Sequence, residues 1–342
     1  MAQEAAVTKR NKKTFGQWLK SRKGQQAVVI IAFSIIPLLL LFTFTYLPFF
    51  EMVDFSFYKM KYVGTRTFIG LDNYKSIFTR DDIVGALKLS LYYMFGAVVQ
   101  ILLALYLATI LSMKVKFSNL FKGCMFFPYL VNGIAIGFIF KFFYTRGYVL
   151  DTILGWCGFN KDALPYWLKD QAINNWSLVA SSVWRYFGQN MILFIGAIMS
   201  VDPSLYEAAD LDGANKLQQF RYIILPSIKT IVTLNIILSI TGSLSAFEAP
   251  FVITTGANGT GTYFIVMNTI AHTNQKVGLA SAMAVFLLLI IFVCTILQKL
   301  FFKYIFRNAT TDDESYSAKK KRLKAAKNAQ KKAAVLEQKG AK

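Results

Sequence analysis

The chain alternates between apolar runs, each about as long as a bilayer is thick, and shorter polar connections. A transmembrane helix needs roughly 20 mainly apolar residues. Windows of that length predict six spans, at residues 27–50, 86–111, 121–143, 177–200, 228–250 and 278–302. Pro37 inside the first span predicts a kink, which neighbouring helices accommodate. The pattern therefore predicts an all-α, polytopic membrane bundle of six helices.

Composition supports this class. Of the 342 residues, 55% are hydrophobic and only 16% are charged, whereas roughly 25% charge is usual in soluble domains. The net charge of +20 is concentrated at the two ends of the chain, so we predict a basic N-terminal segment (1–26) and a basic tail (307–342). Both clusters flank apolar segments, where Lys and Arg mark the cytoplasmic side of a membrane. Nucleic-acid binding is therefore not expected.

The connections between spans predict an orientation. The connection at 112–120 carries Lys114 and Lys116 and no acid. An even number of spans places both termini on the same side as this connection and as the one at 202–226. The positive-inside rule then predicts that both termini are cytoplasmic.

The connection at 202–226, "DPSLYEAADLDGANKLQQFRYIILP", has helix signals unusual for a simple linker. Asp202 is a suitable N-cap and Pro203 suits the first helical position. Gly213 predicts a stop with positive φ, and a second helix over 214–225 is predicted to end at Pro226. The shape alone fits either an interfacial linker or a helix on which a cytoplasmic partner docks.

Part of this connection resembles a known signature. The run "EAADLDGANKLQQFRYIILP" resembles the EAA motif of ABC importer permeases, with Glu207, Ala208, Ala209, Gly213, Leu225 and Pro226 in register. Three further stretches resemble the carbohydrate-uptake, MalF-like branch: "FIGLDNYKSIF" (68–78), "FEAPFVITTGANGTGTYFIVMNTI" (247–270) and "VGLASAMAVFLLLIIF" (277–292). One departure is "GANGTG" (256–261), where family members often have Gly-Gly-Pro.

The resemblance implies a type I importer permease fold in the bacterial cytoplasmic membrane. It divides the chain into a first helix with its outer connection (27–83) and a core permease domain (84–306) containing the EAA loop (202–226). The helix in that loop would be the coupling helix, pressed against an ATPase subunit through Glu207, Ala208, Ala209, Asp210 and Gly213. The implied partners are a second homologous permease subunit, two cytoplasmic ATPases and an extracytoplasmic solute-binding protein that delivers a sugar or oligosaccharide.

Several patterns are missing from the sequence. It has no G-x-x-x-x-G-K-[ST] loop, so ATP and Mg are expected in the partner ATPases and not in this chain. Its one histidine and three scattered cysteines suggest neither an enzyme nor a metal or cofactor site. An ion-coupled secondary transporter or channel for a small polar solute is the alternative. Such carriers tend to keep ionisable residues inside the membrane, whereas Lys88, Lys141, Arg185 and Glu248 lie toward span ends.

A polar stripe predicts where a solute passes. Asn235, Ser239 and Ser243 recur at i, i+4 and i+8, so they share one helix face. The other candidate path residues are Phe247 and Glu248 at the outer end of that span, and Gln189 and Asn190 in the fourth span. Small polar residues also pack membrane helices together. The resemblance favours the path, because in MalF-like permeases the spans that flank the coupling helix line it.

Overall fold

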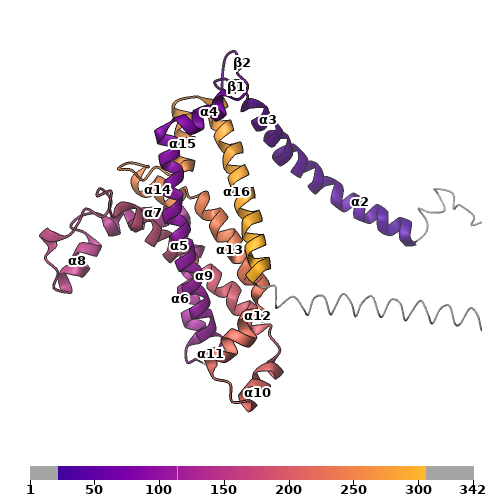
Figure 1. Ribbon diagram of the computed structural model, residues 1–342, viewed down its shortest axis with the longest axis vertical. Helices are drawn as coiled ribbons and strands as arrows, with labels where there is room; N and C mark the ends of the chain where they lie inside the picture. The colour runs from indigo at the N-terminus through magenta and orange to yellow at the C-terminus, as the bar shows by residue number, and fades with distance from the viewer. Residues whose placement is uncertain (1–21, 114, 306–342) are drawn as a thin grey trace, which may run out of the picture.

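The computed structural model describes residues 22–113 and 115–305. The tail (307–342) and almost all of the predicted basic N-terminal segment (1–26) lie outside the described residues. Four helices are long and apolar enough to cross a bilayer alone, and two bent pairs raise that number to six within the described part of the chain. The described fold is therefore a helical membrane bundle with one small hairpin (Figure 1).

The first span leaves the bundle. It comprises α2 (Arg22–Leu41), the π-helix η1 (Phe42–Tyr46) and α3 (Leu47–Phe55), and none of its apolar window is buried inside the chain. In Figure 1 it slants away from the other helices. Pro37 lies within α2, and the kink predicted there stays a prediction.

The outer connection folds back onto the bundle. The hairpin of β1 (Tyr58–Lys59) and β2 (Thr67–Phe68) precedes α4 (Asp72–Thr79). The Asn73 amide anchors the hairpin, donating to the carbonyls of Ser56 at 2.8 Å and Tyr58 at 3.0 Å. Gly278 at the start of α16 (Val277–Ile305) lets that helix approach, because a Cβ there would collide with the Tyr58 carbonyl.

Three helices form the centre of the bundle: α5 (Asp81–Leu111), α9 (Asn174–Met199) and α13 (Lys229–Leu244). Small residues allow their close approach, as is common in membranes. Gly96 of α5 faces Val179 of α9, and Gly188 of α9 lets a further helix, α6 (Ser118–Leu130), place its Met125 backbone against α9. One apolar core joins α5, α9 and α13, with buried Ala104, Phe194 and Val232 among its members.

The third predicted span is not one straight helix. It is divided into α6 (Ser118–Leu130) and α7 (Gly133–Tyr144), which are bent by 99° relative to each other. Val131 is extended, and Asn132 caps α7 by accepting from the Ile134 amide. The apolar run over 121–143 hides this break, because an N-cap is a local signal that hydropathy does not register.

The fifth predicted span is present but interrupted. Residues Lys229–Thr254 together are long and apolar enough to cross a bilayer, yet helix α13 ends at Leu244, residues 245–247 are not helical, and α14 comprises Glu248–Thr254. The Thr262 hydroxyl donates to the Ala246 carbonyl inside this break at 2.6 Å. The chain then runs through α15 (Tyr263–Asn268) and the π-helix η4 (Thr269–Thr273) into α16.

A small outer unit follows α7. It contains α8 (Val149–Trp156) and the 3-10 turn η2 (Lys161–Ala163) and projects to one side in Figure 1. Asp151 is its buried centre, accepting from the Gly147 amide at 2.6 Å and the Trp167 indole at 2.8 Å. Arg146 forms an ion pair with Asp151 and bonds the Leu164 carbonyl.

The fourth connection hangs below the bundle, at the end opposite the hairpin (Figure 1). It starts with α10 (Pro203–Leu211), as predicted. The second helix, predicted over 214–225, is present as an uninterrupted helical run from Lys216 to Ser227. It comprises α11 (Lys216–Gln219), the π-helix η3 (Phe220–Ile224) and α12 (Leu225–Ser227). The predicted end at Pro226 is wrong by one residue, because Pro226 lies inside this run, directly after the π-helix, and the run ends at Ser227.

Candidate functional site

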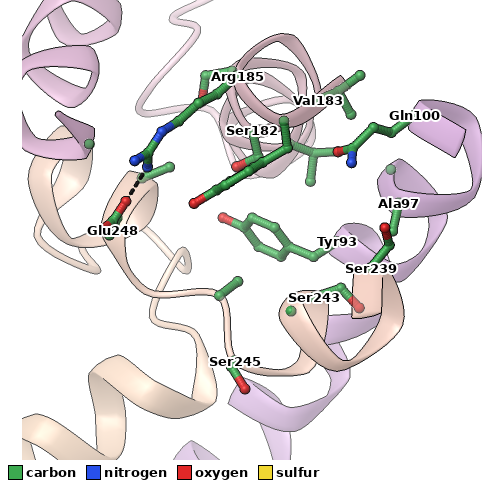
Figure 2. A pocket seen from close by; sticks show the side chains of 18 of the residues that line it. Tyr93, Ala97, Gln100, Ser182, Val183, Arg185, Ser239, Ser243, Ser245 and Glu248 are labelled. Carbon is green, nitrogen blue, oxygen red and sulfur yellow. Dashed lines mark hydrogen bonds and ion pairs between the residues drawn. The ribbon is translucent and has the colours of Figure 1, made fainter. Parts of the chain in front are cut away.

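A cavity of about 550 Å³ lies between α5, α7, α9, α13 and the α13–α14 break (Figure 2). Its size falls within the range of roughly 300–1,000 Å³ that is usual for small-molecule sites. The lining mixes small residues, aromatic rings and uncharged polar groups. A cavity of this kind suits a solute with many hydroxyl groups.

All seven candidate path residues line this one cavity: Gln189, Asn190, Asn235, Ser239, Ser243, Phe247 and Glu248. Some of their polar atoms are already bonded. The Asn235 amide donates to the Ile231 carbonyl at 3.0 Å, and the Ser243 hydroxyl donates to the Ile240 carbonyl at 2.7 Å. Contact between these residues and a solute stays a prediction.

Between α9 and α13 there is one side-chain hydrogen bond, from the Asn190 amide to the Ser239 hydroxyl at 3.4 Å. This distance is long for a hydrogen bond, so the two groups are not tightly committed to each other. The Asn235 and Ser243 side chains of the stripe are therefore bonded within their own helix, whereas Ser239 and the facing Asn190 of α9 are weakly held polar groups.

Two charged side chains line the cavity among the described residues, and they bond each other. Arg185 of α9 donates to Glu248 at the start of α14. Figure 2 shows this pair at one edge of the cavity. The guanidinium also stacks over the Tyr186 ring, 4.9 Å from its centroid. Hydropathy placed both residues near span ends, but their pairing depends on the α13–α14 break and was not predicted.

Tyr93 of α5 is a lining residue that the sequence reading missed. It is only 5% exposed, and its hydroxyl has no hydrogen-bond partner within the described residues. The ring projects into the cavity in Figure 2. Buried hydroxyls are usually bonded, so the Tyr93 hydroxyl is an exception among the residues that line the cavity. A tyrosine in an apolar run carries no signal that separates it from helix packing.

The second candidate region is α10, which contains no buried residue. Its N-terminus is capped as predicted, because the Asp202 carboxylate accepts from the Ser204 amide at 3.0 Å. The hydrogen bond from the Ser204 amide is the largest cause that holds the pKa of Asp202 below its usual range. Glu207, Ala208, Asp210 and Gly213 are exposed and Ala209 is half-buried.

The C-terminus of α10 is a Schellman motif. Gly213 has φ +75°, the Gly213 amide donates to the Asp210 carbonyl, and the Ala214 amide donates to the Ala209 carbonyl at 2.9 Å. A left-handed residue at this place is what the motif requires, and glycine adopts it without strain. The predicted stop at Gly213 is confirmed.

A polar cluster fixes α10 to the next helix. The buried Gln219 of α11 donates to Asp210 at 2.5 Å and to the Ala214 carbonyl at 3.2 Å. Lys216 lies 3.5 Å from the same carboxylate. Tyr206 of α10 and Phe220 of η3 pack on the apolar core shared with α9 and α13. The exposed helix α10 therefore packs on the same apolar core as α9 and α13, two helices that line the cavity.

A bundle of membrane-spanning helices around a polar cavity, with an exposed helix at one end, fits a transport permease. Residues 100–307 match the family "Binding-protein-dependent transport system inner membrane component". The chain belongs to this family, whose members are the permease subunits of ABC importers. This confirms the predicted multi-pass membrane protein and non-catalytic permease subunit, and it favours the importer over the ion-coupled carrier.

Curated relatives agree. The chain is 32% identical to "Probable ABC transporter permease protein YurN" of Bacillus subtilis, over 81% of this chain and 97% of that protein. It is 32% identical to "Arabinooligosaccharides transport system permease protein AraP" of Halalkalibacterium halodurans, over 68% of this chain and 74% of that protein. These matches confirm the resemblance to carbohydrate-uptake permeases.

A solved structure shares the fold. A chain from a bacterial ABC transporter involved in the import of the acidic polysaccharide alginate superposes with a TM-score of 0.73. The match covers 82% of this chain and 97% of that chain, at 18% identity. The predicted permease fold is therefore confirmed.

Proposed function

We propose that this chain is one of two unlike permease subunits of an importer for a sugar or oligosaccharide. A solute-binding protein delivers the sugar from outside, and two cytoplasmic ATPases drive its passage. The family supports a binding-protein-dependent importer, and the relatives' names support the saccharide class. The cavity supports it as well, because amide and hydroxyl groups suit sugar hydroxyls while Tyr93 and Phe247 offer aromatic faces.

The main structural support for this function is the packing that joins α10 to the helices around the cavity. Helix α10 exposes the EAA residues, is fixed to α11 through Asp210 and Gln219, and shares its core with α9 and α13. A rigid helix transmits a displacement that a flexible loop would absorb. ATPase closure on α10 would thus move the walls of the cavity. ATP and Mg would be held by the ATPases, and both termini of this chain would lie in the cytoplasm.

Substitutions in α10 test this coupling. Glu207 makes no hydrogen bond or ion pair within the described part of the chain, so Glu207→Lys should disturb only the surface offered to the ATPase. Gly213→Val should distort the C-terminal motif, because a β-branched residue is strained at φ +75°. Both variants should insert normally in the membrane, yet lose most uptake while ATP hydrolysis no longer responds to the binding protein.

Gly213→Asn is the matched control, since Asn tolerates the left-handed region. It should keep most of the coupled uptake. The readouts are sugar uptake and ATP hydrolysis in proteoliposomes that contain the complete importer. Normal coupled uptake by both Glu207→Lys and Gly213→Val would rule out the coupling role.

A further inference from the structure

The charge of the cavity points to a narrower substrate class than saccharides in general. Arg185 and Glu248 are the two charged lining residues in the described part of the chain, and each is bonded to the other. The remaining polar lining groups are amides and hydroxyls. The cavity wall that this chain contributes therefore has no net charge.

The pair is built into the fold. Arg185 is mostly buried, with a side chain 14% exposed, and it stacks on Tyr186, whereas the Glu248 side chain is 50% exposed. Gly133 at the start of α7 makes room for the pair. A Cβ there would stand 2.5 Å from Arg185 Nη1 and 2.7 Å from Glu248 Cδ, closer than side-chain atoms approach. Three separate elements, α7, α9 and α14, thus converge on one neutralised ion pair.

We propose that the transported saccharide is uncharged, an inference that rests on the proposed function. A carboxylate that enters this cavity loses its hydration and finds the guanidinium already neutralised, so its burial is costly. Sugar hydroxyls instead find groups that both donate and accept. Tyr93 also lines the cavity, and its buried hydroxyl has no partner within the described residues, so a sugar hydroxyl that displaces the atoms covering it would supply one.

The solved structure named above shows why the fold does not decide this point. Its title describes import of an acidic polysaccharide, whereas the described lining of this cavity includes no cation without a bonded acid. The two chains share a fold, and in the described lining of this cavity the cation, Arg185, is bonded to Glu248.

The first test uses the complete importer in liposomes with ATP inside. It is offered a mixture of short uncharged oligosaccharides and the same compounds with one primary hydroxyl oxidised to a carboxylate. The uncharged forms should accumulate at least about tenfold faster. Equal accumulation of the carboxylated forms would overturn the inference and leave the saccharide importer intact. Accumulation of no saccharide, while the binding protein stimulates ATP hydrolysis, would instead refute the proposed function.

The second test isolates this chain's cavity from the selectivity of the binding protein. Calorimetry measures the binding of each transported oligosaccharide and its carboxylated form to the purified permease–ATPase assembly without the binding protein. In Glu248→Gln, Arg185 loses its acid, and the carboxylated form should gain about tenfold in affinity relative to the uncharged form, as expected for one charge-assisted hydrogen bond. The double variant Arg185→Gln/Glu248→Gln should return to the wild-type ratio.

Two results would contradict the inference. One is a correctly assembled Glu248→Gln importer whose ratio of affinities for the carboxylated and uncharged forms equals that of wild type. The other is equal affinity of the wild-type assembly for both forms. This second result can be measured even where the variant does not assemble. As an independent check, Tyr93→Phe should weaken binding of the uncharged form by roughly two- to tenfold. Tyr263→Phe should not, because the Tyr263 hydroxyl donates to the Met283 carbonyl in a core outside the cavity.

Discussion

Single buried polar residues stabilise parts of this chain, and Asp151, in the unit that contains α8, is the clearest example. Its carboxylate is 1% exposed. Burial acts to raise its pKa, but the hydrogen bonds from Gly147 and Trp167 and the charge of Arg146 outweigh burial, so the pKa is below its usual range. The ionised form therefore stabilises the unit that contains α8.

The sign of this effect predicts a pH dependence. Because the folded pKa is depressed, the stabilisation is complete above the unfolded pKa of roughly 4 and disappears as the pH falls through the folded value. Asp151→Asn should remove it at every pH, at a cost on the order of 2 kcal/mol. Hydrogen exchange of residues 146–167 measures both effects. Equal protection in wild type and variant at pH 7 would contradict this account.

A second residue-scale prediction concerns the crossing of α6 and α9. A Cβ at Gly188 would collide with the Met125 carbonyl, so backbone would have to move. Gly188→Ala should lower the thermal stability of the detergent-solubilised protein by several degrees. Gly196→Ala on the same helix is the control, since its Cβ meets nothing and alanine favours helix. Equal stability of the two variants would show that the helices do not cross as closely as described.

At the scale of elements, the sequence predicted what local patterns record. Apolar runs predicted α5, α9 and α16, and the types and order of Asp202, Pro203 and Gly213 predicted both ends of α10. The α6–α7 bend and the α13–α14 break were not predicted, because hydropathy continues through them. These two breaks place Gly133 and Glu248 beside Arg185, so the ion pair could not be derived from spacing along the chain.

The candidate path shows the same division. Helical periodicity placed Asn235, Ser239 and Ser243 on one face, and the structure puts that face on the cavity. Periodicity cannot say which polar atoms are already bonded, and Asn235 and Ser243 prove to donate within their own helix. Tyr93 was missed because the sequence does not show that its buried hydroxyl has no hydrogen-bond partner within the described residues. Only three-dimensional packing reveals this.

At the scale of the whole molecule, the two functional regions lie at different depths of one bundle. The cavity lies among α5, α9 and α13, and α10 projects beyond the end of α9. A shared apolar core connects them without an intervening flexible segment. A partner on α10 and a sugar in the cavity should therefore influence each other through helices α9 and α13.

The measurement that tests this account most directly is site-specific photo-crosslinking in the complete importer. The photoreactive residue replaces Leu211, which is 90% exposed at the end of α10, or Trp156, which is 81% exposed on α8 as the control. Position 211 should crosslink to an ATPase subunit, with a yield that changes on ATP binding, and position 156 should not. Crosslinking of the ATPase from position 156, or none from 211 in an importer that transports sugar, would contradict the central claim.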